Sequence, residues 1–479
     1  MNISLGLTFD DVLLIPQRSS LASRKEADTS SPLSQKITLK MPIISANMDT
    51  VTESEMAIAM ALEGGIGFIH RFMPLENEVE EVKKVKRAQS FVVEDPLTLV
   101  LNGQRVKDAL SFIAQNKVTG LLIVNKDQQL LGILTHRDLV LEDDVEKEIK
   151  KLMTPREKII TGKPNTTLSE AKEILRENKI EKLPLVDSKG VLKGLITRKD
   201  ILHVINNPYA QKDKKGHLMV GAAIGVVGDY LERAQSLVNA GADVLVVDIA
   251  HGHADHTIAC LKKLKSMFSQ TTIVAGNVAS AEGTLDLIKA GADVIKVGVG
   301  PGSMCTTRIV TGHGVPQLTA ITNAAGVAKK YKIPIIADGG IRYSGDIVKA
   351  LAAGASTVMI GSLLTGTQES PGMTVMKNGR KYKMARGMAS LAANWSRKIA
   401  DGKTDNYGLG EYVAEGVEAL VPYRGSTAEI IRQLVGGLRS GMSYCGVRKI
   451  SDLAVKAKFI QITNAGLKES FPHDVEIMQ

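Results

Sequence analysis

The chain has 479 residues, of which 44% are hydrophobic, so it has room for two to three domains or for one large barrel with an insert. Its net charge of +9 comes largely from lysines spread along amphipathic segments, and only 4% of its residues are aromatic, which argues against a specific nucleic-acid partner. The three cysteines form no disulfide framework, the N-terminus does not read as a signal or transit peptide, and there is no apolar run of about eighteen residues, so we expect a cytoplasmic protein with no membrane partner.

Eight short apolar runs, each followed by glycine or a polar residue and then by a helical pattern, organise most of the chain. They lie at 41–49, 65–70, 217–225, 244–252, 272–278, 294–300, 333–340 and 357–362. Buried strands that alternate with helices are typical of parallel α/β folds. Eight such units predict a (β/α)8 TIM barrel.

Polar side chains stand at the carboxyl ends of these runs. They are Asn47, Asp49, His70, Asp248, His251, Asn277, Cys305, Asp338 and Ser362. Any one of them could cap a helix or close a turn. Because the carboxyl ends of barrel strands carry the chemistry in this fold, their occurrence at equivalent points predicts a functional site there.

The most informative of these ends reads KVGVGPGSMCTTR over 296–308. Gly298, Gly300 and Gly302 permit backbone angles and close approaches that a Cβ forbids, so the loop can turn its amides and carbonyls toward a ligand. Cys305 at the tip is placed to act as a nucleophile, provided that nearby groups help to form its thiolate. The alternative is a buried structural cysteine, which is a common role for this residue.

A second pattern repeats between the second and third apolar runs. KVTGLLIV at 117–124 recurs as KIEKLPLV 62 residues later, and GILTHRDL at 132–139 recurs as GLITRKDI. A fixed period of this size indicates two copies of one unit that bury their faces together. The repeat therefore predicts an inserted α+β domain over 92–208, built from copies at 92–147 and 153–208.

This pair of copies resembles tandem CBS modules, which bind adenine or guanine nucleotides in the cleft between repeats. The resemblance implies a regulatory domain that takes purine nucleotides such as ATP, GTP or GMP. By it, the ribose and phosphates are held by Thr135 with Asp138 and by Thr197 with Asp200. A purely structural or oligomerising insert is the alternative, because a Thr-x-x-Asp spacing is not chemically unique.

The barrel motifs resemble those of the IMP dehydrogenase and GMP reductase family, and the match covers nearly the whole chain. The motifs are GPGSMCTTR around Cys305, ADGGIR at 337–342, MIGS at 359–362 and RGMAS at 386–390. The resemblance implies a catalytic barrel with a flap, formed by 1–91 and 209–479. It also implies a homotetramer, and it leaves open whether two tetramers stack into an octamer.

The resemblance assigns ligands to individual residues. The nucleotide contacts are Ser303, Gly340, Gly361 and Ser362 for the phosphate, Asp338 for the ribose, and Gly387, Met388 and Glu415 for the purine. Asp248 and Asn277 would lie against the nicotinamide cofactor. The backbone carbonyls of Gly300, Gly302 and Cys305 would hold a monovalent cation such as K+, as in the dehydrogenases.

Two reactions of this family share a covalent Cys305 thioimidate at purine C2. The dehydrogenase removes hydride from IMP and hydrolyses the thioimidate to XMP, for which a mobile flap supplies a water-activating Arg-Tyr pair. The reductase expels ammonia from GMP and then delivers hydride. Here the best placement of the pair is Asn406 with Tyr407, so the arginine is missing, and Ala385 stands where a phosphate-contacting tyrosine is expected.

Other segments divide between the two enzymes. ANMDTV at 46–51, RSSLASRKEAD at 18–28 and Thr311 resemble reductases, whereas GGIGFIH and GGLRSGMSYCG resemble dehydrogenases. Reductases that carry CBS modules reconcile these features.

The resemblance therefore implies an NADPH-dependent GMP reductase of purine salvage, regulated by nucleotides at the insert. In it, Thr307 and Glu369 form the acid/base pair that protonates the departing amine. The alternative for Glu369 is a carboxylate that caps a helix or braces a loop. The alternatives are an IMP dehydrogenase that uses NAD, and a nucleotide-binding regulatory protein that has lost its activity.

Overall fold

The computed structural model describes residues 3–88, 92, 96–116, 118, 120–140, 142–400, 413–472 and 474–475. Within the chain there are two compact units. One is formed by Met1–Ala88 together with Tyr209–Gln479, and the other by Gln89–Pro208. The second unit spans the part of the chain in which the internal repeat occurs.

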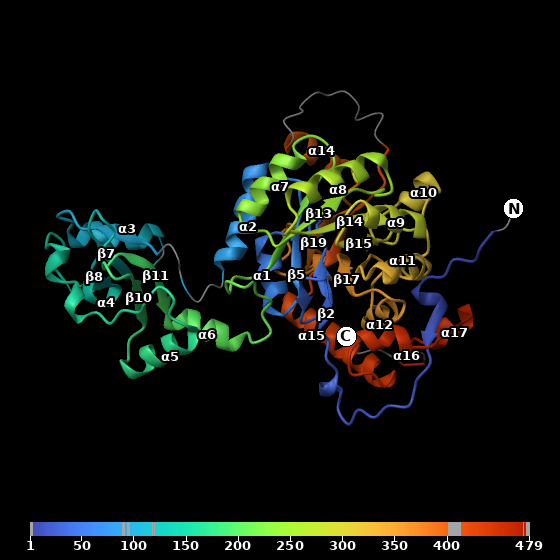
Figure 1. The fold of residues 1–479 in the computed structure, drawn as a ribbon, viewed down its shortest axis with the longest axis horizontal. Helices are drawn as coiled ribbons and strands as arrows, with labels where there is room; N and C mark the ends of the chain where they lie inside the picture. Colours follow the sequence, from blue (N-terminus) through green and yellow to red (C-terminus); the bar gives the residue numbers. More distant parts are fainter. Residues whose placement is uncertain are drawn as a thin grey trace. The chain divides into compact units, whose positions relative to one another are not determined.

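Eight parallel strands close into a barrel in the first unit, in the order β12-β13-β14-β15-β16-β17-β4-β5, and helices surround them (Figure 1). The strands are β4 (Ile43–Ser45), β5 (Ile66–Ile69), β12 (Val220–Ile224), β13 (Val244–Asp248), β14 (Thr272–Val278), β15 (Val294–Val297), β16 (Ile335–Asp338) and β17 (Thr357–Ile360). The main helices are α1 (Ser54–Leu62), α2 (Leu75–Arg87), α7 (Tyr230–Asn239), α8 (Asp255–Met267), α9 (Ala281–Lys289), α11 (Gln317–Tyr331), α12 (Ser344–Ala352) and α15 (Thr427–Tyr444). Each expected apolar run forms one strand, so the predicted TIM barrel is confirmed.

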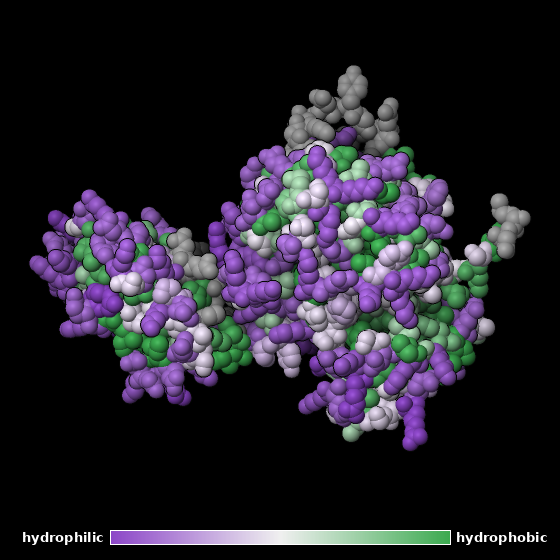
Figure 2. Space-filling view, viewed as in Figure 1, coloured by the Kyte–Doolittle hydropathy of each residue, from purple (hydrophilic) through white to green (hydrophobic). Residues whose placement is uncertain are grey.

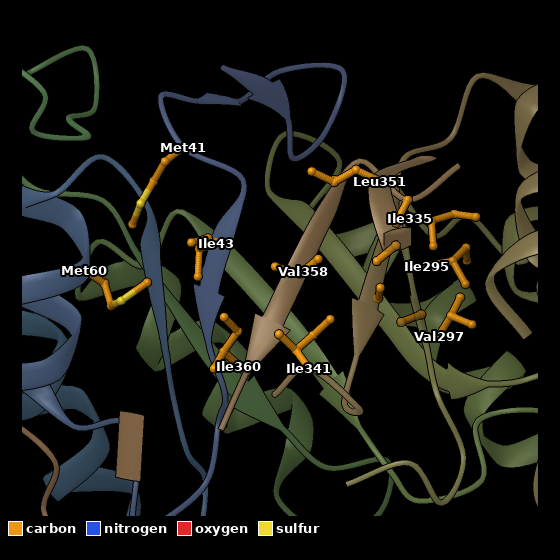
Figure 3. Packing of buried hydrophobic residues seen from close by; sticks show 14 of the residues in the cluster. Met41, Ile43, Met60, Ile295, Val297, Ile335, Ile341, Leu351, Val358 and Ile360 are labelled. Carbon is orange, nitrogen blue, oxygen red and sulfur yellow. The ribbon is translucent and has the colours of Figure 1, made fainter. Parts of the chain in front are cut away.

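The two faces of the barrel strands build two apolar layers. Ile43 and Val358 belong to a large cluster that they share with Met60 of α1. Their chain neighbours Ile44 and Met359 belong to a second cluster made mostly of strand residues. Because successive side chains of a strand point to opposite faces, the first cluster is the layer between barrel and helices and the second fills the barrel. Figure 3 shows part of the outer layer, with Ile43 beside Val358.

Smaller elements lie outside the barrel. An antiparallel sheet of β18 (Thr374–Lys377), β19 (Arg380–Arg386) and β20 (Glu418–Pro422) is accompanied by α14 (Leu391–Ala400). β1 (Val12–Leu14) pairs with β21 (Phe459–Gln461), which joins segments near the two ends of the chain. The remaining pieces are β2 (Ser31–Pro32), β3 (Thr38–Leu39), α10 (Thr307–Thr311), α13 (Ser362–Thr365), α16 (Leu453–Lys456) and α17 (Asn464–Glu469).

The second unit contains two copies of one arrangement. The first has β6 (Thr98–Val100), α3 (Val106–Asn116), β7 (Gly120–Val124), β8 (Leu130–Thr135) and α4 (His136–Val140), and β9 (Thr154–Pro155) extends its sheet. The second has α5 (Leu168–Glu177), β10 (Lys182–Val186), β11 (Leu192–Thr197) and α6 (Arg198–Asn206). Backbone hydrogen bonds join the copies, since Leu192 N donates to Gln128 O at 2.9 Å and Leu130 N to Gly190 O at 3.1 Å.

The surface is largely hydrophilic on the face that Figure 2 shows. An apolar area of the second unit lies over α6, where Leu202 and Ile205 are exposed (Figure 2). Among the residues that the structure describes, no helix combines the length and the apolar character needed to cross a membrane.

Candidate active site

One cavity of about 480 Å³ opens among the loops that follow the barrel strands. The expected residues that line it are Asp248, Asn277, Gly300, Gly302, Ser303, Cys305, Thr307, Asp338, Gly340, Gly361, Ser362, Gly387, Met388 and Glu415. Of the residues expected at this end of the barrel, Asp49, His70, His251 and Glu369 are not part of its lining. The structure therefore brings together side chains that are spread over more than 160 residues of sequence, because parallel strands present their carboxyl ends at one edge.

The loop that carries Cys305 needs its glycines. Gly298 and Gly300 have φ of +150° and +85°. A Cβ on Gly298 would lie 2.1 Å from the carbonyl oxygen of Asp338, and one on Gly300 would lie 2.5 Å from Cγ of Arg308. The loop thus packs directly against the end of β16 on one side and against the Arg308 side chain on the other, which fixes the position of Cys305.

Cys305 is half-buried and takes part in a short chain of hydrogen bonds. Its thiol donates to Oγ1 of Thr307 at 3.2 Å, and that hydroxyl donates to Oε2 of Glu415 at 2.8 Å. The other two cysteines are buried: burial raises the pKa of Cys260 to about 12 and also raises the pKa of Cys445. Those two are structural, whereas the thiol of Cys305 faces the cavity with a carboxylate within reach through one hydroxyl.

Thr307 is hydrogen-bonded to Glu415, not to the expected partner Glu369. The Glu369 carboxylate instead accepts from the backbone N–H and from the hydroxyl of Thr427, each at 2.9 Å, at the first residue of α15. The unpaired N–H groups of a helix start attract a carboxylate in this way. Glu415, which was expected to contact the purine, occupies the place beside Thr307.

A lysine that was not singled out from the sequence lies in the cavity wall. Lys296 Nζ donates to Asp338 Oδ2 at 2.8 Å and to Asn277 Oδ1, and lies 3.6 Å from Asp248 Oδ1. Burial disfavours the ammonium, but the two carboxylates outweigh burial and hold the pKa of Lys296 above its usual value. A signal was present, since a charged residue interrupts the apolar run VIKVGVG.

The segment that holds the expected purine contacts is anchored on both sides. Gly387 N donates to Val417 O at 2.9 Å, and a Cβ on Gly387 would lie 2.7 Å from Met304 O. Arg386 Nε donates to Asp49 Oδ2 at 2.8 Å, and Asp49 N approaches Met388 Sδ at 3.4 Å. Gly387 and Met388 are thereby held against the Cys305 loop.

Few observations bear on the expected cation site and on the expected flap pair. The carbonyl of Gly302 accepts the N–H of Cys305 at 3.1 Å, so it closes a turn of the loop. Across the described residues, no group of three or more His, Cys, Asp or Glu side chains could hold a metal ion. Asn406 and Tyr407 lie outside the described residues. The monovalent cation at the carbonyls stays a prediction.

The fold and this cavity define a TIM-barrel enzyme whose chemistry is built at the carboxyl ends of its strands. The chain belongs to the IMP dehydrogenase / GMP reductase family, because the family model of the IMP dehydrogenase / GMP reductase domain matches residues 6–473. It is therefore a member of a family of nicotinamide-dependent oxidoreductases of purine metabolism. This confirms the resemblance seen in the barrel motifs.

Relatives of both kinds are similar over their whole length. An inosine-5'-monophosphate dehydrogenase of Aquifex aeolicus is 54% identical, with 99% of this chain and 96% of the relative covered. A GMP reductase of Leishmania donovani is 48% identical, with 98% and 97% covered. A solved structure of a GMP reductase variant from Trypanosoma brucei in complex with guanosine 5'-monophosphate has a TM-score of 0.92 and 45% identity, with 99% of each chain covered.

Proposed function

We propose that the protein is an NADPH-dependent GMP reductase, which converts GMP into IMP and ammonia. The observation that carries this proposal is the hydrogen-bonded chain from Cys305 through Thr307 to Glu415. It gives the site a route for the proton that a departing amine requires. Hydrolysis of the same intermediate would also require an activated water, and the flap sequence offers Asn406 where a water-activating arginine is expected.

The first half of the reaction uses these three side chains. The Cys305 sulfur adds to C2 of the purine, and the thiol proton passes through the Thr307 hydroxyl to the Glu415 carboxylate. The proton then returns through Thr307 to the 2-amino group. The C2–N bond breaks, ammonia leaves and a thioimidate remains on Cys305.

The cofactor would lie against Asp248 and Asn277. Both residues line the cavity, and a carboxylate with an amide suits the hydroxyls of a ribose or the carboxamide of nicotinamide. When bound, NADPH supplies hydride to C2. Breaking of the C2–S bond would then release IMP and leave the Cys305 thiolate, which would take up a proton from solvent. Asp338 would hold the nucleotide ribose, while Ser303, Gly340, Gly361 and Ser362 would hold its phosphate.

Relatives favour two candidate reactions. The Trypanosoma and Leishmania proteins named GMP reductase support the reductase, whereas the higher identity to proteins named inosine-5'-monophosphate dehydrogenase favours IMP oxidation with NAD as the second candidate. Purine nucleotides at the insert, a homotetramer or octamer, a monovalent cation and a cytoplasmic location belong to the same proposal.

Parallel incubations test the direction of the reaction. GMP with NADPH and IMP with NAD are followed anaerobically by cofactor absorbance and by ammonia release. The reductase requires one ammonia for each NADPH consumed with GMP, and poor turnover of IMP. Rapid formation of XMP from IMP would assign the dehydrogenase instead, and no turnover in either incubation would favour a regulatory protein.

A further inference from the structure

Lys296 is a charged residue in the middle of a barrel strand that is otherwise apolar. Its side chain is 3% exposed, yet the residue is part of the cavity lining, and its ammonium lies among groups from three other strands. Asp338 ends β16, Asn277 lies in β14, and Asp248 ends β13. A lysine ammonium has three donors, so each can face one of these three residues.

The hydrogen bonds show how the three partners share the ammonium. Asp338 Oδ2 accepts from Lys296 at 2.8 Å and from Asn277 Nδ2 at 2.9 Å. Asn277 Nδ2 also donates to Gly298 O at 2.8 Å, while Asn277 Oδ1 accepts from Lys296. Asp248 is the more distant partner, with its Oδ1 at 3.6 Å. One cation therefore serves two carboxylates that belong to different parts of the cavity.

This sharing makes the two carboxylates interdependent. Hydroxyl groups that donate to Asp338 satisfy part of its negative charge, so the ammonium can shift its interaction toward Asp248. In the same way, a ligand that donates to Asp248 would let the ammonium shift its interaction toward Asp338. Thermodynamic linkage requires the two effects on affinity to be equal.

We propose that Lys296 is a positioning residue that couples occupancy of the nucleotide subsite at Asp338 to occupancy of the cofactor subsite at Asp248 and Asn277. The proposal rests on the assignment of those subsites in the proposed function. It does not depend on which of the two family reactions the enzyme catalyses, because both need a purine nucleotide and a nicotinamide dinucleotide side by side.

The test is a measurement of binding without turnover. Calorimetry measures the dissociation constant of GMP with and without a saturating oxidised dinucleotide. The dinucleotide is NADP+ or NAD+, whichever binds. GMP reacts with neither of them in either candidate reaction. The ratio of the two constants should differ from one by about 5- to 150-fold, the usual range of such coupling. In Lys296→Met the ratio should fall to within about twofold of one.

A matched control exists at the other end of the barrel. Lys86 Nζ lies 2.6 Å from Asp243 Oδ2 and 3.1 Å from Asp213 Oδ2, so it is also a lysine between two aspartates, and it does not line the cavity. Lys86→Met should keep the wild-type ratio even if it lowers stability. A lysine with a merely structural role at position 296 would change both GMP constants equally and leave the ratio unchanged.

If Lys296→Met does not fold, Asp248→Asn replaces it, because loss of that carboxylate breaks the same link from the cofactor side. The proposal is overturned if the ratio of the two GMP constants is already close to one in the wild type. It is also overturned if a folded Lys296→Met keeps the wild-type ratio. If Lys296→Met does not fold, a wild-type ratio in Asp248→Asn overturns it. Failure of both dinucleotides to bind overturns the assignment of the cofactor subsite and the coupling with it. None of these results depends on whether GMP or IMP is turned over, so they are distinct from a failure of the proposed reaction.

Discussion

Thr307 and Glu415 are 108 residues apart in the sequence and share a hydrogen bond of 2.8 Å beside the thiol of Cys305. The backbone strengthens this contact, because Thr306 N donates to Glu415 O at 2.8 Å. The loop after β15 and the segment that precedes β20 therefore form one unit. Any movement of that segment would change the acid/base environment of the nucleophile.

Substitution of Glu415 by glutamine tests its role in proton transfer. The amide can still accept the Thr307 hydroxyl, but it cannot take up a proton. We expect turnover of GMP to fall about 100- to 10,000-fold, the usual contribution of general acid–base catalysis. The affinity for GMP, measured by equilibrium binding, should change only a few-fold. Turnover within tenfold of wild type would exclude Glu415 as the acid/base.

Glu369 provides the contrasting variant. Its carboxylate accepts two hydrogen bonds from Thr427 at the start of α15. Glu369→Ala should lower the free energy of unfolding by about 1 to 3 kcal/mol, the usual cost of leaving buried donors unpaired. Turnover at temperatures where the variant is folded should stay within a few-fold of wild type. A folded Glu369→Ala with no turnover would restore this residue to the reaction.

Cys305→Ala should abolish turnover and leave GMP binding largely intact, because the expected phosphate and ribose contacts other than Ser303 lie on other loops. Binding is measured by calorimetry and turnover by ammonia release. Cys445→Ala is the control, since that thiol is buried outside this cavity. Loss of GMP affinity as large as the loss of rate would indicate a structural role for Cys305.

The sequence predicted the barrel because each strand is a local apolar run followed by its own helix. It also predicted most of the cavity, since residues at the ends of parallel strands meet without further information. It did not predict which carboxylate lies beside Thr307, because the loop that carries Glu369 and the segment that carries Glu415 are placed by tertiary contacts that local pattern does not encode. Lys296 was visible as a charge in a buried run, but its partners are known only once the strands close into a barrel.

Glu78 on α2 makes stability depend on pH. Its Oε2 accepts from Arg233 Nη1 at 2.7 Å, and among the described residues its buried Oε1 has no hydrogen-bond partner. Burial raises the pKa of Glu78 to about 8, from 4.5 in an unperturbed carboxyl, although Arg233 acts against this. Between these pH values the folded protein holds a proton that the unfolded chain releases.

Glu78 should therefore contribute its full stabilisation below pH 4.5. This contribution to the free energy of unfolding should be lost as the pH rises to about 8. The slope is at most about 1.4 kcal/mol per pH unit. Glu78→Gln cannot titrate, so the wild-type advantage in free energy of unfolding over this variant should shrink from pH 5 to pH 8 and then level off. Urea unfolding at each pH measures it.

The control for this effect is on the same helix. Burial opposes the charge of Glu81, but hydrogen bonds from Lys84 and Ser54 hold its pKa below the usual value. The stability that Glu81 contributes is therefore lost only on acidification below about pH 4.5. Glu81→Gln should differ from wild type by a constant amount between pH 5 and pH 8, and a slope equal to that of Glu78→Gln would contradict the assignment.

The regulatory role of the insert can be tested at its two Thr-Asp pairs. Asp138 Oδ2 accepts from the N–H and the hydroxyl of Thr135, both at 2.7 Å, and Asp200 Oδ2 accepts from those of Thr197 at 3.1 and 2.5 Å. Each pair closes the first turn of a helix, whether or not it also binds a nucleotide. A test must therefore separate nucleotide binding from the loss of a cap.

A third pair of a threonine and a carboxylate in the same unit serves as the control for loss of a helix cap. Glu170 Oε2 accepts from the N–H and hydroxyl of Thr167 at 2.7 and 2.9 Å, at the start of α5. We expect GTP or ATP to change the rate of wild type by about 5- to 150-fold, the range of ordinary allosteric coupling. Asp138→Ala combined with Asp200→Ala should blunt this response and leave the unregulated rate near normal, while Glu170→Ala, which also loses a cap, should keep it. Equal loss of the response in both proteins would show that the aspartates act by holding the helices together, and the assignment of a nucleotide to them would fail.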